Sequence, residues 1–305
     1  MPPTRAEFAP PAALSPSLRQ TLRILLARWN TAQTEDDDER GEVQRELIAL
    51  LADDNAAEIA RFLSPEDRAS PFGLAALERW LGLDTFAAAS WLAEQPSATE
   101  SQALLVARAL LHNPSAPPDT WDRLPDSPWK QVLLATAGRE IADTDPASGI
   151  ALAERMAPGA ARTDTLQTIA YAWISRDPRA AARWILSLEE PALREPLVAV
   201  AAKAIAITDP ELAITWLGAV KSETIARETT ASVAELWASR APAEAAAWAE
   251  QFPATETRDA AIDAVARQWF QTDQVAADAW LSGLPDRERV LARLHPAVVA
   301  TTDVD

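Results

Sequence analysis

The chain has 305 residues, 48% of them hydrophobic, with 45 acidic residues against 28 basic ones and a formal net charge of −17 at pH 7. Its lack of cysteine excludes a disulfide framework and any cysteine-based zinc site or nucleophile. The three lysines and dispersed arginines argue against nucleic-acid binding, which needs clustered positive charge. The net negative charge favours solubility and is compatible with basic partners.

The first 40 residues divide into a tail, a helix and an acidic stretch. Residues 1–16 are rich in proline and alanine and are expected to form a disordered tail. Within 17–40, leucines and Trp29 follow a helical spacing over 17–29, which predicts an N-terminal capping helix. Residues 35–39 are all acidic. We expect a solvated acidic loop there rather than a calcium loop, because the oxygen ligands do not alternate and Leu47 stands where a closing Glu would be needed.

Residues 41–300 contain an internal repeat, predicted to form one continuous helical domain. Each unit is centred on a residue that we call the anchor, with apolar side chains 11, 8 and 4 positions before it and 4, 7, 8 and 11 positions after it. These spacings indicate two amphipathic helices per unit. The anchors are spaced by 29 and then by 32 residues, giving about eight units: Asn55, Asp84, Asn113, Asp145, Asp177, Asp209, Ala241 and Asp273.

The anchors have the chemistry of a helix start. An Asp side chain accepts hydrogen bonds from free backbone N–H groups, and proline suits the first helical turn. Asp145, Asp177 and Asp209, each followed by proline, are therefore predicted to be N-caps of the second helices. Nine of the twelve tryptophans lie four residues before or seven after an anchor, which predicts packing between helices rather than a sugar-stacking or base-stacking surface.

The unit at 113–128 is irregular. Five prolines in this segment leave room only for a short second helix around Trp121, and Trp129 begins the next unit. We expect a bend or an inserted loop here.

The unit resembles the tetratricopeptide-type α-solenoid. The match rests on a small Ala followed four residues later by an aromatic, as in Ala180 and Trp184 or Ala87 and Trp91, with proline near the unit boundary. The family's period is 34 with a Leu-Gly pair on the first helix, whereas this chain has 32 with Gln167-Thr168 near that place. The resemblance implies an all-α right-handed superhelix of antiparallel hairpins that binds a protein or peptide in a concave groove.

Two sets of polar residues recur at the repeat interval. The first lies six residues before the anchor, opposite the apolar stripe of the first helix, where it forms either a ligand-facing row or a solvated face. Its members are Arg139, Tyr171, Lys203, Glu235 and Arg267, flanked by Gln167, Asp263 and Phe270. The second set lies fifteen residues before the anchor and is expected to pair with acids or cap helix ends; it comprises Arg162, Arg194 and Arg258.

No catalytic constellation is found. The sequence has no phosphate-binding glycine loop and no nucleophile elbow, and His112 and His295 lack the partners of a metal site. We therefore expect a non-catalytic scaffold without cofactor or metal, binding a protein or peptide whose identity stays open. The alternatives are an enzyme or small-ligand protein with its site at 113–128, or a structural subunit of an assembly.

No apolar run is long enough to span a membrane, and the start lacks a signal-peptide pattern. The expected location is the cytoplasm, with a soluble extracytoplasmic domain separated from its signal or anchor as the alternative. The sequence leaves the oligomeric state open.

Overall fold

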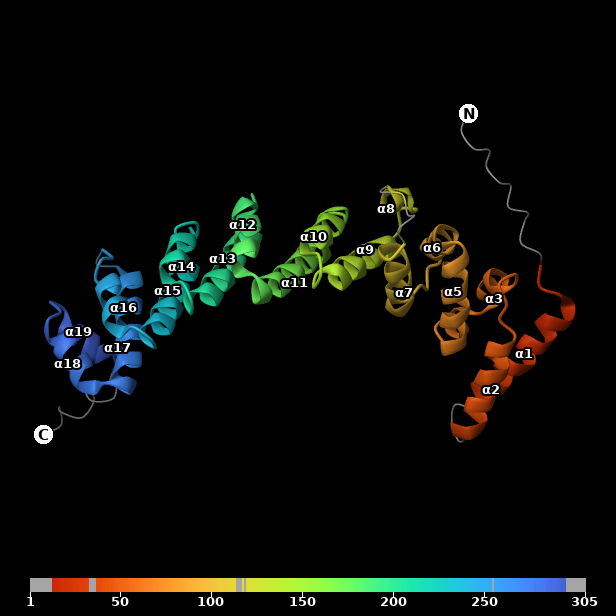
Figure 1. The fold of residues 1–305 in the computed structure, drawn as a ribbon, viewed down its shortest axis with the longest axis horizontal. Helices are drawn as coiled ribbons and strands as arrows, with labels where there is room; N and C mark the ends of the chain where they lie inside the picture. Colours follow the sequence, from red (N-terminus) through yellow and green to blue (C-terminus); the bar gives the residue numbers. More distant parts are fainter. Residues whose placement is uncertain (1–12, 33–36, 114–116, 118, 254, 295–305) are drawn as a thin grey trace, which may run out of the picture. The chain divides into compact units, whose positions relative to one another are not determined.

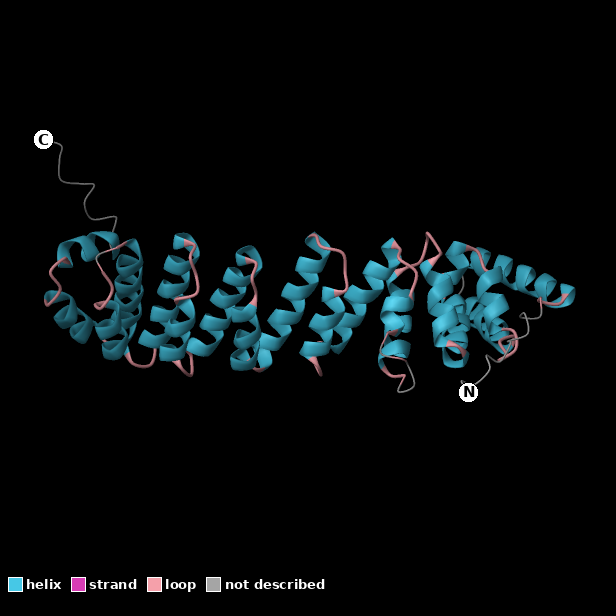
Figure 2. Ribbon diagram, turned by 90° about the horizontal axis from the view of Figure 1, so that it is seen from above, coloured by secondary structure: helices cyan, strands magenta, loops and turns pink. Residues whose placement is uncertain are grey.

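The computed structural model describes residues 13–32, 37–113, 117, 119–253 and 255–294. Throughout these ranges the regular elements are α-helices joined by loops, without a strand (Figure 2). The predicted all-α class is therefore confirmed. Contacts group the chain into two compact units, Met1–Thr165 and Leu166–Asp305.

The first unit holds ten complete helices among its described residues. In chain order these are α1 (Pro16–Thr31), α2 (Asp37–Ala49), α3 (Ala56–Phe62), α4 (Pro65–Arg68), α5 (Pro71–Leu83), α6 (Thr85–Ala93), α7 (Glu100–Leu111), α8 (Thr120–Arg123), α9 (Pro128–Ile141) and α10 (Pro146–Glu154). Helices α3, α5, α7 and α9 pack successively on one another, while α6 contacts α5 and α7, and α10 contacts α9.

Helix α11 (Ala160–Arg176) begins in the first unit and continues into the second. The second unit then contains α12 (Pro178–Ser187), α13 (Pro191–Ala206), α14 (Pro210–Leu217), α15 (Glu223–Ala238), α16 (Pro242–Ala249), α17 (Glu256–Thr272), α18 (Gln274–Ser282) and α19 (Arg287–Leu294). Helices α13, α15, α17 and α19 pack in succession, and α14 and α16 each contact the helix before and the helix after (Figure 1).

The N-cap prediction is confirmed. Asp145, Asp177 and Asp209 precede α10, α12 and α14, and each carboxylate accepts a hydrogen bond from the backbone N–H three residues later, at 2.9 to 3.0 Å. Asp84 and Asp273 do the same for α6 and α18. These bonds satisfy an N–H that has no partner inside the helix, so the anchors begin the second helices.

Small residues four positions after the anchor allow the two helices of a hairpin to approach closely. The alanines at this position in α6, α12, α14, α16 and α18 are completely buried. In α10 the position is Gly149, where an added Cβ would lie 2.7 Å from the carbonyl oxygen of Gly138 on α9. A larger side chain there would force α9 and α10 apart.

Tryptophans pack between the two helices of a hairpin. Four pairs join the residue four before the anchor to the residue seven after it, with ring centroids 5.3 to 6.3 Å apart; they are Trp80–Trp91, Trp173–Trp184, Trp237–Trp248 and Trp269–Trp280. All twelve indoles are buried or half-buried. The predicted packing role is confirmed, because these rings contact one another between the two helices and are not fully exposed to solvent.

The irregular segment has the predicted short helix, since α8 is a single turn that contains Trp121, and Trp129 lies in the first turn of α9. The start of the chain differs from expectation in two places. Residues 37–39, predicted to be an acidic loop, begin α2, while 35 and 36 lie outside the described residues, as does nearly all of the predicted tail. Asn55 does not cap α3 through its side chain, which instead bridges the N–H of Ala52 and the carbonyl of Leu50.

Candidate functional site

Polar residues near the start of α9, α13, α15 and α17 tie consecutive hairpins together. Glu195 on α13 is 6% exposed, and its two carboxylate oxygens accept hydrogen bonds from the N–H groups of Lys221 and Ser222, at 3.2 and 3.0 Å, in the loop before α15. Gln131, at the same repeat position on α9, accepts from the N–H of Ala157 at 2.8 Å. We call this position, fourteen residues before the anchor, the clamp.

The clamp position uses charge pairs in the last hairpins. Arg227 on α15 pairs with Glu256 at the start of α17, and Asp259 on α17 pairs with Arg289 and Arg293 on α19. Each of the four residues therefore reaches the following hairpin, although their chemistry differs. This position is not apparent from the apolar and anchor pattern of the sequence.

The neighbouring position, fifteen residues before the anchor, closes the loop that precedes the first helix. Arg194 donates to the carbonyl of Leu188 at 2.9 Å, and Lys130 donates to the carbonyl of Leu124 at the same distance, six residues earlier in both cases. Arg258 instead pairs with Asp286 at 2.8 Å. The predicted structural role is confirmed for Arg194 and Arg258, and Lys130 takes the same position with a lysine in place of the expected arginine.

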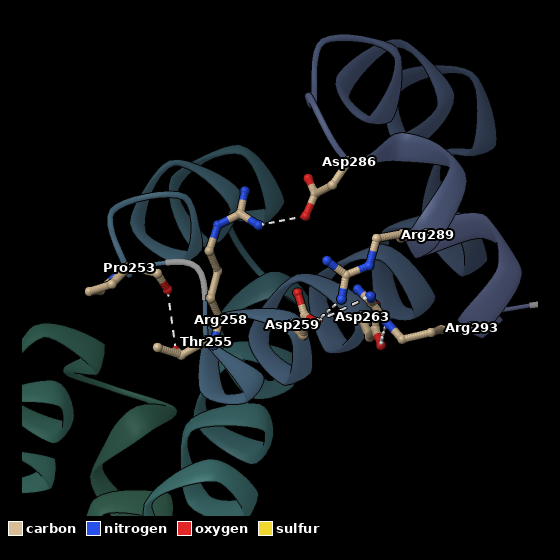
Figure 3. A network of polar contacts seen from close by, with 8 residues as sticks. All are labelled: Pro253, Thr255, Arg258, Asp259, Asp263, Asp286, Arg289 and Arg293. Carbon is tan, nitrogen blue, oxygen red and sulfur yellow. Dashed lines mark hydrogen bonds and ion pairs between the residues drawn. The ribbon is translucent and has the colours of Figure 1, made fainter.

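A network of ion pairs attaches α19 to the rest of the second unit (Figure 3). Arg293 binds both carboxylate oxygens of Asp263, at 2.7 and 2.8 Å, and also approaches Asp259. The hydrogen bond from Arg258, together with its charge, holds the pKa of Asp286 below its usual value despite partial desolvation. The bonds to Asp263 raise the pKa of Arg293. Asp263 was predicted to flank the ligand-facing row, but both of its carboxylate oxygens are bound by Arg293.

The predicted row lies on exposed helix surface. Lys203, Glu235 and Arg267 are exposed on α13, α15 and α17, three helices that pack in succession (Figure 1). None of these three side chains has an ion pair or hydrogen bond with another described residue. Tyr171 on α11 is 44% exposed, whereas Gln167 and Phe270 are half-buried.

Uncharged residues border this row on both sides. Three positions before the row stand Val200, Ser232 and Ala264, and four positions after it stand Ile207, Ser239 and Gln271. Val200 on α13 and Ile207, its C-cap residue, are 36% and 43% exposed, so one apolar side chain stands on each side of Lys203. We call the nine residues of these three levels the row face.

Arg139, the predicted row member on α9, lies in the first unit. It forms an ion pair of 3.3 Å with Glu100 and borders a hollow of about 400 Å³ between α7 and α9. Thr136, which is 6% exposed, also lines the hollow, and its hydroxyl has no hydrogen-bond partner within the described residues.

The irregular segment contributes Asn113, Pro117, Thr120 and Arg123 to a second hollow, of about 330 Å³, which is also lined by residues of α5, α6 and α7. Its Asp84 caps α6, the hydroxyls of Thr85 and Thr120 donate to backbone carbonyls, and Arg123 lies over the ring of Phe86 at 4.8 Å. These polar groups are thus used to hold helix ends and side chains in place.

His112 is the C-cap residue of α7, with its Nδ1 atom 2.8 Å from the carbonyl oxygen of Arg108, and His295 lies outside the described residues. Within the described ranges no three His, Asp or Glu side chains are placed to hold a metal ion. Among the helices described, none is long and apolar enough to cross a bilayer.

The sequence matches no protein-family profile, and neither the curated proteins nor the solved structures searched contain a significant match.

Proposed function

We propose that the chain is an α-solenoid of about eight helical hairpins that acts as a scaffold and binds an extended peptide segment of a partner protein on the row face. The observation that carries this proposal is the unpaired state of Lys203, Glu235 and Arg267. Exposed charges of opposite sign on neighbouring helices are free to contact a ligand.

The same chain pairs charges between hairpins wherever it uses them for structure. Arg108 binds Glu140 at 2.7 Å, Arg155 binds Asp122 at 3.1 Å, and Arg179 binds Asp209 at 2.6 Å. The row alternates in sign along three packed helices and yet forms no such pair within the described residues. The three row charges therefore do not serve to join neighbouring hairpins through ion pairs among the described residues.

The apolar neighbours support the same surface. Val200 and Ile207, three residues before and four residues after Lys203, are both exposed. A peptide that covers them would remove apolar area from water, which supplies affinity, while contacts to the charges would set its register.

A peptide-display selection against the purified protein tests the proposal. Selected peptides should lose most of their affinity for a Val200→Gln, Ile207→Gln variant and retain it for Val275→Gln. Val275 is a control because it is 80% exposed on α18, a helix that carries no row-face residue. Equal binding by all three proteins would refute the proposed location.

Retained circular-dichroism spectra and melting temperatures would show that these surface changes leave the fold intact. A selection that returns no peptide bound at the row face would refute the scaffold proposal itself.

A further inference from the structure

We propose that the row face reads a local sequence motif in its ligand, namely an acidic, a basic and an acidic residue at positions i, i+3 and i+6 of a polyproline-II segment. The inference rests on the proposed function and adds to it the chemical class of the partner. Its basis is the order of charges at one helical level: Lys203, then Glu235, then Arg267.

The spacing of packed helices sets the spacing of the motif. Axes of packed α-helices lie about 8 to 10 Å apart. Because α13, α15 and α17 pack in succession, their row residues repeat at about this interval. A polyproline-II chain rises about 3.1 Å per residue with three residues per turn, so every third side chain returns to the same side after about 9 Å.

A β-strand does not meet the same requirement. Its side chains alternate between faces, so residues on one side repeat at about 6.6 or 13 Å. Neither interval matches the expected spacing of the row. Of these two extended conformations, the spacing therefore favours polyproline II, which also needs no hydrogen bonds from the helix surface.

The six residues three before and four after the row positions are uncharged. The nearest charged groups already have partners, because Arg240 donates to the carbonyl of Ile207 and Asp263 binds Arg293. The three row residues are therefore the charges left to contact the ligand. Ser232 and Ser239 direct their hydroxyls to backbone carbonyls of their own helix, and Ala264 is buried. The acid–base–acid order is also unchanged when the peptide is reversed. The motif can consequently be tested without knowing the direction of the bound chain.

Two synthetic probes of opposite charge order test the inference by fluorescence anisotropy. The matched probe contains Glu-Pro-Pro-Lys-Pro-Pro-Glu and the inverted probe contains Lys-Pro-Pro-Glu-Pro-Pro-Lys, both between identical neutral flanks with one leucine. Three exposed ion pairs that change from attractive to repulsive should give about a tenfold preference for the matched probe.

The Lys203→Glu, Glu235→Lys, Arg267→Glu variant provides the decisive comparison. Its three changed residues are exposed and unpaired among the described residues, so the fold should be preserved, as a melting curve would verify. The variant should prefer the inverted probe by a similar factor. Shortening the matched spacers to one proline should remove the preference of the native protein.

An affinity ratio near one for both proteins, or a ratio that does not invert, would overturn the motif. If peptides from the display selection still require Val200 and Ile207 in that case, the proposed function stands and only the motif falls. If those peptides also ignore Val200 and Ile207, both proposals fail.

Discussion

Replacing Glu195 should show how strongly one clamp residue couples consecutive hairpins. The carboxylate is 6% exposed and binds two backbone N–H groups, those of Lys221 and Ser222. A hydrogen bond to a charged group contributes about 1.5 to 3 kcal/mol, so two such bonds set an upper range of about 3 to 6 kcal/mol. Because Lys221 is exposed and its loop can rehydrate, we expect Glu195→Ala to lower the free energy of unfolding by about 3 kcal/mol.

The matched variant is Glu195→Gln. It retains one acceptor oxygen and should resemble Gln131, which binds the single N–H of Ala157 at the equivalent place. We expect it to cost about 1 to 2 kcal/mol, since only one of the two bonds to backbone N–H is lost. Urea unfolding measures both values, and hydrogen exchange should increase first at the amides of Lys221 and Ser222. If Glu195→Ala costs less than about 0.5 kcal/mol, the clamp does not hold the hairpins together.

Three further changes test other parts of the structure. Ala241 has the backbone angles of the Asp anchors but no capping side chain, so Ala241→Asp should raise the free energy of unfolding by about 1 kcal/mol in urea. Trp216 is 7% exposed, so Trp216→Ala should cost about 3 to 5 kcal/mol, and a near-neutral result would place this indole outside the core. Asp286 has a lowered pKa in the folded state, so its stabilising effect is present above about pH 3.9 and is lost as the pH falls through the folded value. Exchange of the α19 amides should therefore accelerate in acid, and Asp286→Asn should bring that acceleration to neutral pH; unchanged exchange would contradict the role of the Arg258 pair.

The helices and their buried faces could be predicted because they depend on local spacing. An apolar stripe, an Asp at the anchor and a proline after it specify two helices without knowledge of distant residues. Ile169 and Ile185, predicted on opposite sides of Asp177, are accordingly both fully buried. The capping angles of the Asp anchors agree closely for the same reason.

The clamp could not be predicted from residue type. Glu195, Gln131, Arg227 and Asp259 occupy one repeat position with negative, neutral and positive side chains. Their shared property is geometric, since each reaches the beginning of the following hairpin. A polar residue recurring fourteen positions before these anchors was a usable signal, but the partners lie 26 to 34 residues onward and differ from hairpin to hairpin.

The start of the chain departs from the expected pattern because its first repeat has Asn55, and not an aspartate, at the anchor position. Asn55 has a carbonyl oxygen that could accept from the first turn of α3, but its amide bridges Leu50 and Ala52 instead. Asparagine can both donate and accept, so it stabilises a turn where aspartate can only accept. The extra helix α4, begun by Ser64 and Pro65, then fills the link to α5.

The strongly acidic chain and the proposed acid–base–acid motif are compatible because they act over different distances. The net charge of −17 generates a long-range field that favours ligands with basic flanks, and this field affects mainly the association rate. At physiological salt the screening length is about 8 Å, so a residue in direct contact with Lys203 or Arg267 is governed by that contact rather than by remote acids. Raising the salt concentration should therefore slow the binding of a basic-flanked peptide much more than it changes the affinity ratio between matched and inverted motifs. A ratio that vanishes in parallel with the association rate would mean that only the overall field, and no local register, is being recognised.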